Sequence, residues 1–177
     1  MKKENLTTAE TFALALQHHE KNELQVAEQL YKQILKTEPD HVESIFRLGS
    51  LLIQTGNFDK AQQLLNQVVK IDPNHAKAHN NLGTIFQQMK KTQEAINCYE
   101  KAIQINPNYA GAYNNLGNIQ RELGEHQKAI SSYEKAIQIQ PNYAKAHNNL
   151  GIVLQELGEY QKAISSFEKA IQIQPNY

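Results

Sequence analysis

The sequence predicts an all-α solenoid of repeated helix-turn-helix units, and three periodic features carry this prediction. The five prolines are spaced by 34 residues, at Pro39, Pro73, Pro107, Pro141 and Pro175. Four glycines and five alanines keep the same step: Gly49, Gly83, Gly117 and Gly151, and Ala27, Ala61, Ala95, Ala129 and Ala163. A fixed period of this length indicates stacked structural repeats and argues against one irregular globular core.

Each period contains two helices and two tight turns. Apolar residues recur three and four positions apart, as in Tyr113, Leu116 and Ile119, which is the spacing of one helix face. Gly124 is a stop signal between the two helices, because glycine accepts the left-handed conformation at a helix end. Pro141 and Asn142 end the second helix, since proline has no amide hydrogen and asparagine favours turns. The unit is therefore helix, turn, helix, turn.

The turn between the paired helices has glycine in three periods, at Gly56, Gly124 and Gly158. Asn22 and Lys90 occupy the same place in the other two periods. If the turn keeps its left-handed conformation, lysine there costs about 1 kcal/mol, and asparagine costs less.

The spacing resembles the tetratricopeptide repeat (TPR), whose pattern runs W-x2-L-G-x2-Y, A-x3-F and P. The Leu-Gly pair recurs at Leu48, Leu82, Leu116 and Leu150, each followed by glycine. The A-x3-F pair is Ala27/Tyr31, Ala61/Leu65, Ala95/Tyr99, Ala129/Tyr133 and Ala163/Phe167. The tryptophan position holds Thr11, Ile45, His79, Tyr113 and His147.

The resemblance covers residues 8–177 and implies a right-handed α-solenoid whose first helices line a concave groove. It divides the chain into an N-terminal tail, 1–7, and five repeats: TPR 1 at 8–41, TPR 2 at 42–75, TPR 3 at 76–109, TPR 4 at 110–143 and TPR 5 at 144–177. The function that it implies is binding of a protein or peptide partner.

Composition argues against several other classes. Lys+Arg and Asp+Glu both number 18, so the chain lacks the basic excess of a nucleic-acid binder. No run approaches the roughly 20 apolar residues of a membrane-spanning helix. Cys98 is the single cysteine, which favours a reducing compartment and a cytoplasmic location. We therefore expect neither nucleic acid nor a membrane as partner.

The residues that could carry chemistry have simpler interpretations in the repeat. His75 and His79 share a helix face but have no third ligand at a convincing spacing, and Cys98 falls at a packing position. Glu122 and Glu125 look like solvated charges at a helix end. We expect no catalytic residue, no metal site and no cofactor in these repeats, so the chain is not expected to be an enzyme, although a longer protein could carry a catalytic domain.

The candidate binding residues come from the groove positions of the family, which are 2, 5, 6, 9, 12 and 13 of each repeat. Asparagine fills positions 5 and 6 of TPR 3 to TPR 5. The position-6 residues Asn81, Asn115 and Asn149 look like the asparagine ladder in the TPR superhelix of O-linked N-acetylglucosamine transferases. The predicted peptide-binding residues are Asn80, Asn81, Asn114, Asn115, Asn148, Asn149, Asn118, Lys77, Lys145 and Arg47.

An asparagine amide offers a donor and an acceptor, so it can pair with the main chain of an extended peptide without reading its side chains. The alternative is that part of each asparagine row packs against the neighbouring repeat while the rest forms a solvated polar face.

Apolar residues replace the asparagines toward the N-terminus, at Phe12, Leu16, Phe46 and Ile53. They could form an anchor pocket or a self-association patch, or they could cover one another. At the other end Phe167 and Ile171 are expected to be exposed on an uncapped last helix. Either the chain is a fragment of a longer protein, or it forms a homo-oligomer end to end through this helix.

Three functions stay open at this point. The chain could be a stand-alone interaction scaffold or a self-assembling scaffold. Its opening segment also looks like the start of bacterial TPR proteins, many of which carry a downstream glycosyltransferase or sulfotransferase. These repeats would then form a substrate-docking arm of a larger enzyme, an analogy that rests on the family alone.

Overall fold

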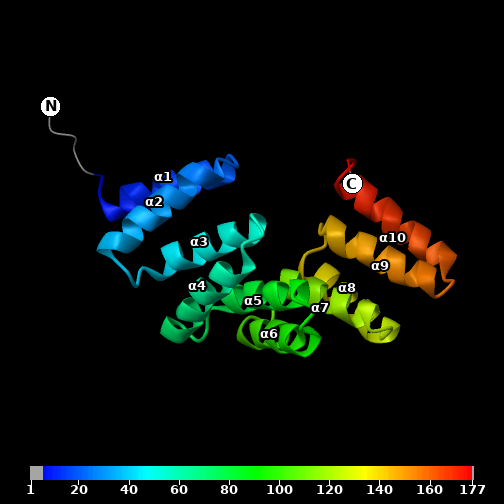
Figure 1. The fold of residues 1–177 in the computed structure, drawn as a ribbon. Coiled ribbons are helices and arrows are strands. Elements are labelled where there is room, and N and C mark those ends of the chain that lie inside the picture. The colour runs from blue at the N-terminus through cyan, green and yellow to red at the C-terminus, as the bar shows by residue number, and fades with distance from the viewer. Residues whose placement is uncertain (1–5, 177) are drawn as a thin grey trace. The chain divides into compact units, whose positions relative to one another are not determined.

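The computed structural model describes residues 6–176, and this part of the chain forms ten α-helices and no strand (Figure 1). Residues 1–5, which belong to the expected N-terminal tail, and Tyr177 lie outside the described residues. The helices are α1 Thr8–Glu20, α2 Leu24–Thr37, α3 Val42–Gln54, α4 Phe58–Ile71, α5 Ala76–Gln88, α6 Thr92–Ile105, α7 Ala110–Glu122, α8 His126–Ile139, α9 Ala144–Glu156 and α10 Tyr160–Ile173.

The chain divides into two compact units, Met1–Ile85 and Phe86–Tyr177. In unit 1, α1 packs on α2, α2 on α3 and α3 on α4. In unit 2, each helix from α6 to α10 packs on the next, and α7 also contacts α9. Each unit therefore contains two helix pairs that pack against each other, α1/α2 with α3/α4 in unit 1 and α7/α8 with α9/α10 in unit 2, as in a helical TPR solenoid.

The turns inside the helix pairs have the left-handed conformation that the sequence predicts. Gly56, Gly124 and Gly158 have φ angles of 75°, 74° and 78°. Asn22 and Lys90 adopt the same conformation, with φ of 61° and 59°. The turn geometry is thus kept where glycine is absent, and Lys90 has the left-handed backbone that is strained for a residue with a side chain.

The glycine that recurs in the first helix of the repeats leaves room for an aromatic ring of the second helix in TPR 4 and TPR 5. A Cβ atom on Gly117 would lie 2.7 Å from Cε1 of Tyr133. On Gly151 it would lie 2.6 Å from Cε1 of Phe167. These distances are shorter than real Cβ contacts, so the first and second helices of TPR 4 and TPR 5 can approach this closely only because neither glycine carries a side chain.

The tryptophan position of the family has a different role in two repeats. His79 donates through Nε2 to the carbonyl oxygen of Pro73 at 3.0 Å, and His147 donates in the same way to Pro141 at 2.9 Å. Each histidine therefore ties the first helix of its repeat to the turn that precedes it. The sequence predicted only packing at this position.

Candidate peptide-binding site

The two asparagine rows differ in exposure. The position-5 residues Asn80 and Asn114 are buried, with 7% and 4% of their surface exposed, and Asn148 is half-buried. At position 6, Asn81, Asn115 and Asn149 are all half-buried. The position-5 side chains of TPR 3 and TPR 4 therefore serve mainly in packing, whereas the position-6 side chains keep access to solvent.

In each unit a position-6 asparagine is tied to position 9 of the preceding repeat. In unit 1, Asn81 Nδ2 donates to Ser50 Oγ at 2.9 Å. In unit 2, Asn149 Nδ2 donates to Asn118 Oδ1 at 2.9 Å. The predicted ligand-binding side chains thus also connect consecutive repeats. Ser50 was not among the predicted residues, although its place at position 9, equivalent to that of Asn118, could have indicated it.

Unit 2 contains a larger amide network. Asn149 uses both hydrogens of its amide nitrogen, since it also donates to Asn114 Oδ1 at 3.0 Å. The second lone pair of Asn118 Oδ1 accepts the hydroxyl hydrogen of Tyr133 at 2.9 Å. Tyr133 was assigned only to packing by the sequence. Its hydroxyl role could have been suspected from the contrast with Phe167, which fills the same position in TPR 5.

Burial of this tyrosine determines whether its hydroxyl is protonated. Tyr133 has 0% of its surface exposed, and burial raises its pKa to about 12. The phenol therefore keeps its proton at neutral pH and acts as a donor to Asn118.

The network leaves one acceptor and one donor unused. Within residues 6–176, Asn149 Oδ1 accepts no hydrogen bond and Asn118 Nδ2 donates none. Both residues are half-buried, and their amides are joined to each other by the 2.9 Å bond. An acceptor and a donor side by side match the N–H and C=O groups of a peptide main chain.

The predicted charged residues differ in their surroundings. Lys77 and Lys145 are exposed. Arg47 replaces asparagine in TPR 2, where its Nε donates to Glu43 Oε1 at 2.8 Å and its guanidinium lies 5.8 Å from the ring centre of Phe46. This arginine is thus held in place by a carboxylate and an aromatic ring.

The expected apolar patch of unit 1 is only partly a surface. Phe46 is 6% exposed and packs on the ring of His75, with ring centres 4.7 Å apart, so it is not available for self-association, because the next turn covers it. Phe12 is half-buried against Tyr31 and His41. Leu16 and Ile53 are also half-buried.

The apolar residues of the last helix, α10, are more exposed than their equivalents in α8. Ile164 and Ile171 of α10 are 50% and 54% exposed, whereas Phe167 is half-buried. Their equivalents in α8, Ile130 and Ile137, are half-buried beneath α9.

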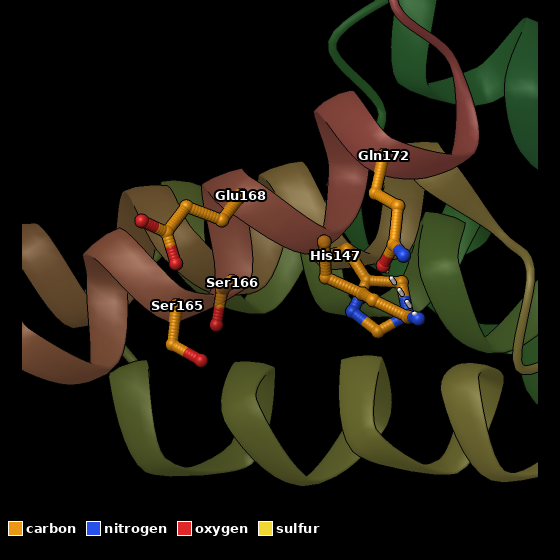
Figure 2. Close-up of a pocket in the computed structure, with 6 residues that line it drawn as sticks. His147, Ser165, Ser166, Glu168 and Gln172 are labelled. Carbon is orange, nitrogen blue, oxygen red and sulfur yellow. Dashed lines mark hydrogen bonds between the residues drawn. The ribbon is translucent and has the colours of Figure 1, made fainter.

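A depression in unit 2 has no asparagine among its lining residues (Figure 2). It has a volume of about 490 Å³ and is lined by His147 of α9 and by polar residues of α10: Ser165, Ser166, Glu168, Lys169 and Gln172. Lys169 Nζ donates to Gln172 Oε1 at 2.9 Å, and the ring of His147 is bonded to Pro141. Lys169 is thus bonded to a neutral amide and His147 to the backbone, so we assign no function to this depression.

The groups with potential chemistry are occupied by structural contacts. His75 accepts the backbone N–H of Ala78 through Nδ1 at 3.1 Å, and His79 bonds Pro73 as described above. Cys98 is half-buried, and burial raises its pKa to about 11, so its thiol is protonated at neutral pH. Among the described residues, no cluster of three or more His, Cys, Asp or Glu could hold a metal, and no helix of residues 6–176 has the length and apolar character needed to cross a bilayer.

The repeats match known proteins over nearly the whole chain. Models of the tetratricopeptide repeat match residues 18–83, 75–142 and 108–176. The crystal structure of MamA is 31% identical and superposes with a TM-score of 0.74, covering 92% of this chain and 95% of MamA. No curated protein sequence matches with significance.

Two more distant structures share the fold alone. A thermophilic TPR protein from Thermus thermophilus is 19% identical, with a TM-score of 0.83 and coverage of 96% of this chain and 92% of the other. PilF of Pseudomonas aeruginosa is 18% identical, with a TM-score of 0.84 and coverage of 93% and 75%. The tetratricopeptide repeats form a protein-interaction scaffold. The chain belongs to the tetratricopeptide-repeat family.

Proposed function

We propose that this scaffold binds an extended segment of a partner protein through the asparagine faces of its first helices. The observation that carries the proposal is the amide pair of unit 2, in which Asn149 Oδ1 and Asn118 Nδ2 have no partner in the described part of the chain. An extended main chain supplies the complementary N–H and C=O groups, and it does so whatever its side chains are.

The charge of the chain fits a sequence-tolerant site. Lys+Arg and Asp+Glu balance at 18 each, so no overall field selects acidic or basic partners. Hydrogen bonds to the main chain then supply affinity, and the half-buried setting of Asn118 and Asn149 strengthens these bonds relative to fully solvated ones.

A peptide selected from a random displayed library on the 177-residue chain tests the proposal. Its Kd is measured by calorimetry on the wild type, on the Asn115→Ala/Asn149→Ala variant and on Asn97→Ala. Asn97 is an exposed asparagine of the second helix α6 and serves as control. We expect the double variant to lose about tenfold or more in affinity, since each lost bond contributes about 1 kcal/mol, and the control to bind normally.

Circular dichroism must show unchanged helicity in both variants. Equal affinity of the double variant and the wild type would count against the asparagine face. A library that yields no binding peptide would count against the proposal as well.

A second candidate function is self-association through α10. Ile164 and Ile171 are exposed there, although the same residue type is covered by α9 at the equivalent positions of α8. The helix α1 of a second copy could pack on α10 as α9 packs on α8, but its side chains fit this contact poorly. Glu10 and Gln17 stand at the positions where α9 packs Ala146 and Val153 against α8. We therefore propose that α10 pairs with α10 of a second copy.

Light scattering against concentration tests this pairing. We expect the mass to rise from one chain to two in the wild type and to stay at one in Ile171→Glu. Val26→Glu is the matched control, because Val26 is an apolar residue of α2 with 41% exposure. A monomer at all concentrations, or equal loss in the control, would remove the second candidate. The docking-arm function stays a prediction from the sequence resemblance.

A further inference from the structure

We propose that the buried hydroxyl of Tyr133 sets the direction of the amide network and thereby the direction in which a main chain lies across Asn149 and Asn118. The inference rests on the proposed function, which it deepens by naming a positioning residue and the polarity of the ligand. It starts from a property of amides: oxygen and nitrogen have nearly the same size, so an amide network can exist in two opposite arrangements.

In the observed arrangement, Asn149 Nδ2 donates to Asn114 Oδ1 and to Asn118 Oδ1. Turning the three amides by half a rotation gives the reverse arrangement, in which Asn114 and Asn118 donate to Asn149 Oδ1. The bonds among the three asparagines are equal in number in both arrangements, although Asn114 would then turn its oxygen toward Asn115 Oδ1 in place of the Nδ2 that donates to it at 3.5 Å. The groups left for a ligand are exchanged, because Asn149 would then offer donors and Asn118 an acceptor.

Tyr133 removes this degeneracy. Its hydroxyl donates to Asn118 Oδ1 at 2.9 Å, and its surface is 0% exposed. In the reverse arrangement the hydroxyl oxygen of Tyr133 would accept a hydrogen from Asn118 Nδ2, and the hydroxyl hydrogen would have no acceptor on Asn118. A buried donor without an acceptor is strongly unfavourable, so the observed arrangement is selected. Since burial keeps Tyr133 protonated, the selection holds throughout the neutral range.

The fixed arrangement has a consequence for the ligand. In an extended chain the N–H and C=O of one residue point to the same side, with the N–H first along the chain. The N–H therefore pairs with Asn149 Oδ1 and the C=O with Asn118 Nδ2. The ligand runs from α9 toward α7 in its N-to-C direction, and a ligand in the opposite direction would place its C=O against the oxygen of Asn149.

Side-chain amide exchange measured by NMR on the free chain tests the network without any ligand. In the wild type the amide hydrogens of Asn149 are both bonded and should exchange slowly, while those of Asn118 exchange fast. Tyr133→Phe removes only the hydroxyl, and phenylalanine is tolerated at this position, as Phe167 shows beside Gly151. In this variant we expect the protection of Asn149 to fall severalfold and that of Asn118 to rise.

Tyr31→Phe is the control, because Tyr31 is also 0% exposed but its hydroxyl contacts His19 rather than an asparagine. It should leave both amides of the network unchanged. Unaltered protection in Tyr133→Phe, or fast exchange of Asn149 in the wild type, would overturn the inference even if peptides bind.

The ligand direction is tested with the selected peptide, by replacing each of its N–H groups in turn by an ester oxygen. We expect one position to lose about tenfold in affinity on the wild type, and this loss to disappear on Asn149→Ala and to shrink on Tyr133→Phe. If Asn149→Ala abolishes the loss but Tyr133→Phe keeps it in full, the proposed function stands and the role of Tyr133 is wrong. If no ester matters on any variant, the main-chain recognition itself fails.

Discussion

Lys90 has a backbone conformation that suits glycine, and replacing it should stabilise the chain. Its φ of 59° matches the 74° of Gly124 in the corresponding turn. A side chain in this region costs about 1 kcal/mol, part of which the more flexible unfolded glycine offsets. We expect Lys90→Gly to raise the free energy of unfolding in urea by several tenths of a kcal/mol.

The neighbouring Lys91 supplies the control for this change, because its φ is −92°. Lys91→Gly gains no relief of strain and should be neutral or destabilising. Stabilisation by both substitutions, or by neither, would show that the left-handed turn at Lys90 is not strained.

His19 should make the stability of unit 1 depend on pH. Burial lowers its pKa below 6.5, and its Nδ1 lies 3.3 Å from the hydroxyl of Tyr31. The unfolded chain therefore binds a proton more readily than the folded one, so this stability is complete above the unfolded pKa and is lost as the pH falls through it. We expect the melting temperature of His19→Gln to fall less between about pH 7.5 and 5.5 than that of the wild type. Parallel curves for the two proteins would contradict this assignment.

At this scale the sequence predicted the kind of residue but not its surroundings. The 34-residue period placed Asn80 and Asn81 next to each other, yet only the packed repeats show that Asn80 is 7% exposed while Asn81 bonds Ser50, 31 residues away. The sequence left open whether Phe46 lies at a surface or is covered, and in the structure its ring packs on His75. Such contacts depend on how neighbouring repeats stack, which local spacing does not encode.

The first helix α1 begins with a reciprocal side-chain cap. Thr7 accepts the N–H of Glu10, and Glu10 accepts the N–H of Thr7 at 2.8 Å, which is a capping box. Thr7→Ala should lower the free energy of unfolding by about 1 kcal/mol. Asn57, the N-cap residue of α4, makes no side-chain bond of this kind, so Asn57→Ala should change the free energy of unfolding much less. A similar loss in both variants, measured by urea unfolding, would show that the capping box contributes nothing specific.

Helices and turns were the most predictable elements because their signals are local. Glycine or a substitute ends each first helix, and proline follows each second helix by two residues, as Pro141 follows Ile139. The sequence predicted less well which helices expose their apolar residues to solvent. The sequences of α8 and α10 are almost identical, but Ile137 is half-buried and Ile171 is 54% exposed, because only α8 has another helix pair packed on it.

For the whole molecule, stacking means that each repeat is stabilised mainly by its neighbours. In unit 2 the contacts of α9 and α10 with the rest of the unit run through α8 and α7. TPR 5 therefore depends on its packing against TPR 4. A destabilising substitution in TPR 4 should also destabilise TPR 5, whereas one in TPR 5 should leave TPR 4 stable.

Two equivalent substitutions separate local damage from damage that spreads. Gly117→Ala places a Cβ 2.7 Å from Tyr133, and Gly151→Ala places one 2.6 Å from Phe167, so the local overcrowding is nearly the same and should cost about 1–3 kcal/mol in each. Hydrogen exchange followed by mass spectrometry should show faster exchange in α7 through α10 for Gly117→Ala, but only in α9 and α10 for Gly151→Ala. Identical patterns would mean that unit 2 opens as one cooperative body, because a purely nearest-neighbour stack cannot transmit the two changes equally.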